Sequence, residues 1–246
     1  MSSPAEAAAT LIEGTLLGGR VRYAQLDTGY RTGLEPVLLA ASVPASRGDH
    51  VLEAGTGAGA GLLCLAARLG GLTGLGLERD PALAAVAAAN LQANAHTGIQ
   101  AACADLLEWH PDRVFDHAFA NPPWHDPGGT PSPDIGRAAA KRASPGLLGA
   151  WTAALAAALR PRGTLSLIVP AACLGEAVVA LTTAKCAEVT VIPLWPRAGS
   201  AAKLVILRGV RLGRGPCTML PGLTLHADAG YSAAAEAVLR HGAALP

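Results

Sequence analysis

The sequence predicts an α/β fold in which a mostly parallel sheet of seven strands is flanked by helices on both faces. Three observations support this prediction. Short apolar runs alternate along the chain with stretches of helical periodicity, the pattern of strand–helix–strand units. The chain has 246 residues, of which 51% are apolar, enough for a sizeable core. No internal repeat or low-complexity linker divides it, so a single domain over residues 1–246 is expected.

The expected strands and helices follow one another as a parallel sheet requires. Strands are expected at 50–53, 72–77, 99–104, 115–120, 164–169, 189–194 and 204–210. Helices are expected at 62–69, 81–94 and 147–159, and a strand followed by a helix over 165–184. The last two strands are linked by residues 195–203, a connection too short for a helical crossover. We therefore expect them to run antiparallel and to form the edge of the sheet.

A small N-terminal element of a hairpin and a helix is expected at about 14–45, ahead of the sheet. Gly18-Gly19 lies between two apolar segments and is a two-residue hairpin signal. Residues 34–43 read as a short helix, with Pro36 tolerated in its first turn.

Charge and cysteine content exclude several classes of protein. The net charge of +1 provides no global positive field for a nucleic acid, so any RNA would be held by a local patch, by shape or by stacking. Five cysteines without a C-x-x-C pair argue against a disulfide framework and a zinc site, so no metal is expected. They indicate a reducing, cytoplasmic location. Neither the N-terminus nor the interrupted apolar stretch 165–184 reads as a signal peptide or membrane span.

The segment 51–59 places three glycines between an expected strand and an expected helix. Gly55 and Gly57 allow the backbone to approach a ligand closely, and the following helix offers free N–H groups. Such a loop also fits NAD or a purely structural turn. Glu53, two residues before the first glycine, favours S-adenosylmethionine, whose ammonium group the acid can hold directly or through water. The alternative for Glu53 is a capping or packing role at the strand end.

Two further acids stand at the ends of the next two expected strands. Glu78 is placed where an acid can accept hydrogen bonds from ribose hydroxyls. Asp105 is placed to accept one from the adenine amino group, although an ordinary helix-capping role explains it equally well. Together with the loop, these acids predict a cofactor site at the carboxyl edge of the sheet.

Asn121-Pro122-Pro123-Trp124 directly follows the expected strand 115–120. The side-chain oxygen of Asn121 and a rigidly held backbone carbonyl at Pro122 can each accept one N–H of a planar amino group, which turns the nitrogen lone pair toward a methyl donor. Trp124 can stack on a planar substrate. Asn-Pro dipeptides also begin ordinary turns, but a turn does not explain the coincidence with the loop and the two acids.

With these residues the chain resembles the small-domain methyltransferases that carry an Asn-Pro-Pro-aromatic motif. Within that group it is similar to the bacterial tRNA adenine-N6 methyltransferases that modify tRNA for valine. The resemblance covers nearly the whole chain and rests on residues 25–31, 37–41, 51–59, 76–78, 105, 115–124, 222–226 and 230–231. The family usually has Asp where Glu53 and Glu35 stand, and Tyr or Phe where Trp124 stands.

The resemblance implies a Rossmann-like methyltransferase fold, S-adenosylmethionine as cofactor and the exocyclic amine of an adenine in tRNA as acceptor. Arg31 belongs to the cofactor-flanking motif. Trp124 would stack the base, which must leave its own stack to reach the site. Lys141 and Arg142, with Arg137, are candidate phosphate contacts; a solvated loop face is their alternative reading.

Three other functions stay open at this point. The same motif can hold a glutamine side chain of a translation factor, or the N2 amine of a guanine in ribosomal RNA. Glutamine methyltransferases of this kind usually carry a separate N-terminal helical domain, for which about 50 residues before the glycine loop are few. A non-catalytic binding module with the same fold is the third. The oligomeric state is not predicted.

Overall fold

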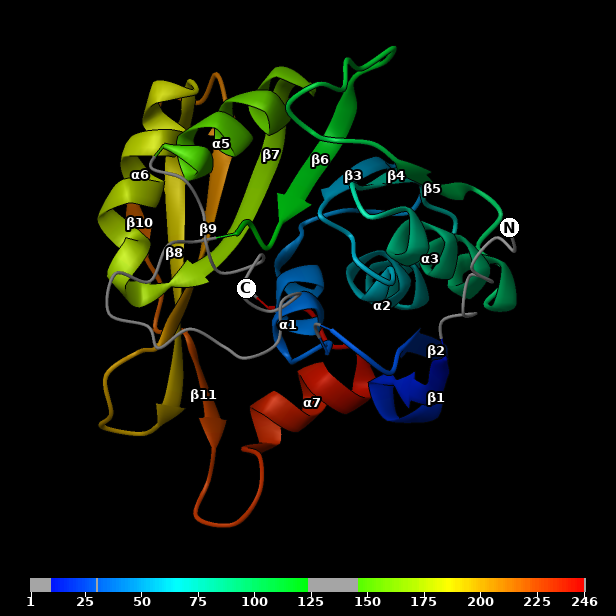
Figure 1. Cartoon of the computed structure of the whole chain (residues 1–246). Coiled ribbons are helices and arrows are strands. Elements are labelled where there is room, and N and C mark those ends of the chain that lie inside the picture. Colours follow the sequence, from blue (N-terminus) through cyan, green and yellow to red (C-terminus); the bar gives the residue numbers. More distant parts are fainter. Residues whose placement is uncertain (1–9, 30, 124–145, 246) are drawn as a thin grey trace, which may run out of the picture.

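The computed structural model describes residues 10–29, 31–123 and 146–245. Within these ranges nine strands form one twisted sheet, in the order β10-β8-β9-β7-β6-β3-β4-β5, with β11 also paired to β8 (Figure 1). The strands are β3 His50–Ala54, β4 Thr73–Glu78, β5 Ile99–Cys103, β6 Phe115–Ala120, β7 Leu159–Pro170, β8 Cys186–Arg197, β9 Leu204–Arg211, β10 Thr218–Met219 and β11 Leu223–His226. A separate hairpin pairs β1 Leu11–Leu16 with β2 Val21–Leu26.

Helices cover both faces of the sheet, as the sequence predicts (Figure 1). Those described are α1 Glu35–Ser42, α2 Ala60–Leu69, α3 Pro81–Ala93, α5 Leu147–Ala157, α6 Leu174–Thr183 and α7 Ala233–His241, with short 3-10 turns Leu17–Gly19 and Ala171–Cys173. Successive residues of a strand point to opposite faces. Thus Phe119 of β6 packs in the core that includes α1 and α2, whereas Ala118 and Ala120 pack in the core that includes α5 and α6.

The strand directions agree with the prediction. Strands β3 to β7 are parallel to one another, and β9 runs antiparallel to both β7 and β8. The antiparallel arrangement of the last two predicted strands is therefore confirmed. Beyond the seven predicted strands, β10 and β11 add two short parallel segments to β8, so the pair does not end the sheet. Both segments are short, and the two residues of β10 are exposed, so neither gives a strand pattern in the sequence.

The N-terminal hairpin and helix are present, with one correction to the turn. Leu16 pairs with Val21, so four residues connect the strands instead of two. The connection is a 3-10 turn, and a Cβ at Gly18 would lie 2.9 Å from the carbonyl oxygen of Arg240 on α7. The close approach of α7, a helix absent from the predictions, therefore explains why glycine stands here.

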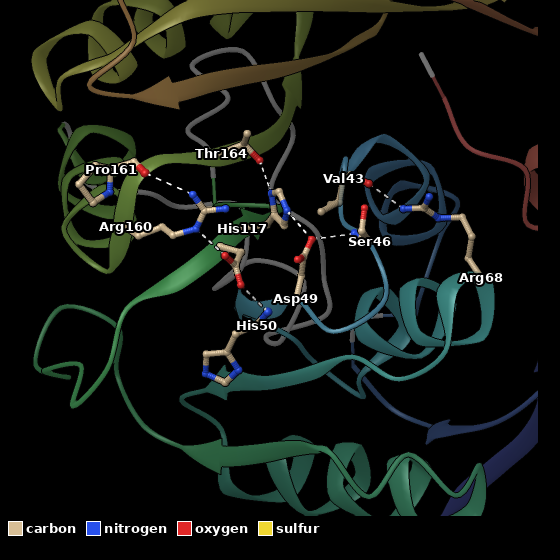
Figure 2. A network of polar contacts seen from close by, with 10 residues as sticks. Val43, Ser46, Asp49, His50, Arg68, His117, Arg160, Pro161 and Thr164 are labelled. Atoms are coloured by element: carbon tan, nitrogen blue, oxygen red, sulfur yellow. Dashed lines mark hydrogen bonds and ion pairs between the residues drawn. The ribbon is translucent and has the colours of Figure 1, made fainter.

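A polar network joins the strands at the edge opposite the glycine loop (Figure 2). The buried ring of His117 on β6 bonds through Nδ1 to Thr164 Oγ1 (2.7 Å) and through Nε2 to Asp49 Oδ2 (3.1 Å). Asp116 accepts from the backbone N of His50 and is paired with Arg160. The network connects the amino ends of β3, β6 and β7, so it supports the fold at a distance from the strand ends that carry the predicted site.

We expect the protein to lose stability in acid as the buried His117 of this network becomes protonated. Burial lowers the pKa of His117 below its ordinary 6.5, although the hydrogen bond and charge of Asp49 oppose the shift. The folded state thus favours the neutral ring, and its contribution is present above pH 6.5 and lost as pH falls through 6.5 toward the folded pKa. Denaturant unfolding measured between pH 7 and 5 should show a free energy of unfolding that falls with falling pH, and His117→Gln should make this slope smaller. His110→Gln, at an exposed histidine, should leave the slope unchanged; equal slopes in all three proteins contradict the prediction.

Candidate active site

Four of the predicted site residues, Glu53, Glu78, Asp105 and Asn121, lie at or just after the carboxyl ends of four neighbouring parallel strands. The order β6-β3-β4-β5 puts these ends side by side, and Ala54 is in register with both Ala120 and Leu77. The glycine loop that follows Ala54 is consequently next to Asn121 on one side and Glu78 on the other. In open α/β sheets this edge is where ligands bind.

Three glycines shape the loop between β3 and α2. Gly55, Gly57 and Gly59 all have positive φ (66°, 55° and 89°), which favours glycine at each position. The backbone N atoms of Gly55 and Thr56 donate to the carbonyl oxygen of Leu77 at 2.8 and 3.1 Å, which ties the loop to β4. A Cβ at Gly57 would meet open space, so the backbone is uncovered at this point and accessible to a bound molecule.

Glu78 ends β4 with a half-buried carboxylate that accepts two backbone N–H groups. Its Oε2 accepts from Gly57 N and its Oε1 from Asp80 N, both at 2.9 Å. The acid therefore borders the open side of the glycine loop. An anionic acceptor beside uncovered backbone matches the hydroxyl and amino groups of S-adenosylmethionine, so the residues present fit this cofactor.

Glu53 is almost completely buried, at 4% exposure, beneath the loop. Its Oε2 accepts hydrogen bonds from Thr56 Oγ1 and from Leu62 N of α2. Burial raises the pKa of Glu53 to about 8, although these two hydrogen bonds oppose the shift. A Cβ at Gly61 would lie 2.1 Å from Glu53 Oε1, so the helix can pass over the carboxyl only with glycine there. These contacts connect β3, the loop and α2; binding of an ammonium by Glu53 stays a prediction.

Asp105 follows β5, half-buried, and its Oδ1 accepts from Leu107 N at 2.9 Å. Asp105 thus caps the turn at residues 106–108, and it does not cap a helix, which was the alternative that the sequence left open. Its Oδ2 lies 3.9 Å from a guanidinium nitrogen of Arg79, in an exposed ion pair of little energetic weight. The contact between Asp105 and the adenine amino group stays a prediction.

Asn121 is half-buried directly after β6, and Pro122 behind it is buried. Parallel register between Ala120 and Ala54 brings Asn121 next to Gly55, as the sequence predicts.

Arg31 is exposed on the connection between β2 and α1, and within the described ranges it forms no hydrogen bond or ion pair. Predictions for Trp124, Lys141, Arg142, Arg137 and the segment 125–146 lie outside the described residues, Gly146 excepted.

Trp151 of α5 packs against the candidate site, a contact that the sequence did not predict. A Cβ at Gly55 would lie 3.1 Å from the Cη2 atom of its ring, so the indole packs directly on the glycine loop. The ring is only partly buried and adds an aromatic surface at the strand end. Its position on a helix of mainly apolar residues gives no local sign of this contact, which depends on how α5 packs on the sheet.

A family model described as "Methyltransferase small domain" matches residues 24–149, which is about half of the chain and includes the glycine loop, both acids and Asn121. The chain belongs to the methyltransferase small-domain family. It therefore contains an S-adenosylmethionine-dependent methyltransferase domain, in agreement with the fit of the loop and Glu78 to that cofactor.

Two curated relatives are similar to this chain in sequence, and both are named tRNA1(Val) (adenine(37)-N6)-methyltransferase. The chain is 33% identical over 156 residues to the one from Shewanella loihica, covering 60% of this chain and 63% of the relative. It is 32% identical over 127 residues to the one from an Enterobacter species, covering 49% and 52%. The chain thus spans less than two thirds of the length of either relative.

Solved structures show the same fold. A predicted O-methyltransferase from Agrobacterium tumefaciens superposes with a TM-score of 0.70 at 23% identity, over 85% of this chain and 97% of that one. An S-adenosylmethionine-dependent O-methyltransferase from Thermotoga maritima gives 0.54 at 16% identity, over 76% and 68%. The predicted Rossmann-like methyltransferase fold is therefore confirmed.

Two further features of the described residues concern membranes and metal ions. None of the helices in the described ranges is both long and apolar enough to cross a membrane. Within the same ranges, His, Cys, Asp and Glu side chains do not gather in groups of three or more suited to a metal ion.

Replacing Glu78 should weaken cofactor binding. Glu78→Ala removes the predicted ribose acceptor and also the bond that Gly57 N donates, so the loop loses support at its open side. We expect S-adenosylhomocysteine affinity to fall by about 1–3 kcal/mol, roughly 5- to 150-fold, in titration calorimetry. Glu236→Ala on the remote helix α7 is the control. Wild-type affinity in the Glu78→Ala protein would contradict the assignment.

Proposed function

We propose that the chain transfers a methyl group from S-adenosylmethionine to the exocyclic N6 amine of an adenine in tRNA, as one domain spanning residues 1–246. The observation that supports this best is the neighbourhood of Asn121-Pro122-Pro123 and the glycine loop on adjacent strands. Residues suited to hold an amine and residues suited to hold a methyl donor thereby meet at one point of the sheet edge.

Asn121 and Pro122 would act on the acceptor. The amide oxygen of Asn121 and the backbone carbonyl of Pro122 accept the two N–H bonds of the amine, which directs its lone pair toward the loop. Pro122 and Pro123 fix φ, so the carbonyl is held in place before the substrate arrives. S-adenosylmethionine supplies an activated methyl group on a sulfonium. Positioning by this chain's residues then provides much of the rate gain, on the order of several kcal/mol.

The choice of an adenine in tRNA is supported by the names of the two relatives, each about one third identical over the matched part. Trp124 would stack the flipped base, and Lys141 with Arg142 would contact phosphates. Because the net charge is only +1, such local contacts are needed to hold RNA. The same proposal puts the protein in the cytoplasm with its tRNA.

The test is methyl transfer from labelled S-adenosylmethionine to three acceptors: unmodified bulk tRNA, a release-factor protein and unmodified ribosomal RNA. We expect label in tRNA alone, recovered as N6-methyladenosine when the nucleosides are separated by mass spectrometry. Label in glutamine of the protein, or in N2-methylguanosine of ribosomal RNA, would replace the proposal with the corresponding alternative. Cofactor binding with no transfer to any acceptor would indicate a binding module.

A further inference from the structure

Asn90 on α3 joins the glycine loop to the N-terminal hairpin. The residue is 4% exposed. Its Oδ1 accepts from Ala24 N at 2.9 Å, and its Nδ2 donates to Ala24 O at 2.8 Å. The same Nδ2 donates to Ala58 O at 2.9 Å. Only this orientation of the amide satisfies all three backbone partners, because two of them are acceptors and one is a donor.

The two segments that Asn90 joins are the glycine loop and the strand that precedes the cofactor-flanking segment 25–31. Ala58 stands between Gly57 and Gly59 in the loop, and a Cβ at Gly59 would already lie 3.4 Å from Ala87 of α3. Ala24 of β2 leads directly into residues 25–31. Gln25 and Tyr23 hold the end of this segment through hydrogen bonds to Thr32. Asn90 thus connects the donor loop to the strand from which the cofactor-flanking segment begins.

Asn94, one turn further along the chain, provides a natural comparison. Its Oδ1 accepts from Arg22 N at 2.9 Å and its Nδ2 donates to Arg22 O at 2.8 Å, the same pairing that Asn90 makes with Ala24. Its third bond goes to Asn90 O within the helix and not to the loop. The two asparagines therefore hold the hairpin alike, and only Asn90 also contacts the glycine loop.

We propose that Asn90 is a positioning residue for the cofactor site, which fixes the glycine loop and the hairpin segment as one unit. The inference rests on the proposed function, because it concerns how the site binds S-adenosylmethionine. Without the amide, Ala58 O loses its partner and the loop is held to α3 only by packing at Gly59. A loop whose supporting contacts are lost holds its ligand groups less accurately, so binding weakens even though Asn90 does not touch the cofactor.

The first experiment compares Asn90→Ala with Asn94→Ala by titration calorimetry with S-adenosylhomocysteine. Both variants should lose stability, since each removes two hydrogen bonds from the hairpin backbone. The loss should be larger for Asn90→Ala, because the bonds of Asn90 are partly or fully buried whereas those between Asn94 and Arg22 are exposed. Only Asn90→Ala should also raise the dissociation constant, by about tenfold, the scale of one lost buried hydrogen bond. Equal dissociation constants for the two variants would overturn the inference. If the wild-type protein itself does not bind S-adenosylhomocysteine, the cofactor assignment fails instead.

The second experiment uses the wild-type protein and does not depend on either variant folding. Amide hydrogen exchange is followed by NMR with and without S-adenosylhomocysteine. Binding should slow exchange of the Ala24 N–H, which Asn90 accepts, more than exchange of the Arg22 N–H, which Asn94 accepts. Equal protection of the two amides, or protection of neither, would mean that the loop and the hairpin are not connected through Asn90.

Discussion

Asn121→Ala should abolish most methyl transfer while leaving cofactor affinity nearly intact. The half-buried side chain stands at the end of β6, where it would contact the acceptor amine and not the donor. Its oxygen matters most as the nitrogen changes geometry during transfer, so the loss should fall on turnover. Removing one positioned hydrogen-bond partner of this kind lowers the rate roughly a hundredfold or more. Single-turnover transfer to tRNA and calorimetry with S-adenosylhomocysteine measure the two quantities separately.

Asn94→Ala is the matched control, because it removes an asparagine amide at the C-terminal end of α3 that contacts the hairpin and not the strand end. Its turnover per folded molecule should equal that of wild type. A wild-type rate for Asn121→Ala on the acceptor that works would show that the catalytic assignment is wrong, even with fold and cofactor correct.

Trp124→Ala should instead lower substrate affinity, since a stacking surface is worth about 1–3 kcal/mol per base, and Trp124→Phe should keep much of the activity.

Glu53→Gln should make the protein more stable than wild type in mild alkali. Burial raises the pKa of Glu53 from 4.5 to about 8. The folded state therefore favours the protonated acid, and this contribution is fully present below pH 4.5 and lost as pH rises through about 8. A shift of this size corresponds to a loss on the order of several kcal/mol. Glutamine has nearly the shape of the protonated acid and does not ionise. The free energy of unfolding of the Glu53→Gln protein should therefore not show this loss.

Guanidinium denaturation at pH 5, 6.5 and 8 measures the effect as the difference between Glu53→Gln and wild type. The difference should grow in favour of the variant as pH rises. Glu236→Gln, at a half-exposed acid of α7, should give no such trend. Parallel curves for Glu53→Gln and wild type would contradict a neutral buried acid.

Glu53 also allows a check on the predicted ammonium contact. A carboxyl that is protonated in the free protein must ionise to pair with an ammonium, so binding would release a proton. Calorimetry near neutral pH in buffers of different ionisation enthalpy would detect this release. Binding without proton release would assign Glu53 to the support of Thr56 and α2 alone.

The sequence by itself determined the succession of elements and the edge at which the site forms. Apolar runs and helical periodicity are local properties, and they predicted β6 and α3 to within a residue or two. The short link between β8 and β9 predicted their antiparallel pairing, because chain length limits which crossovers are possible. Glycines that need positive φ and acids at strand ends likewise identify themselves by position, as Gly55 and Glu78 do.

What only the tertiary structure decided is where polar and aromatic side chains point. Glu53 turns under the loop because Thr56 and Leu62 offer donors there and Gly61 leaves room. Asn90 contacts residues 66 and 32 positions away, and Trp151 reaches Gly55 across the sheet face. The four-residue hairpin turn depends on α7 from the other end of the chain. Such arrangements depend on partners distant in sequence, and a buried polar group adopts whichever orientation satisfies its hydrogen bonds in the packed protein.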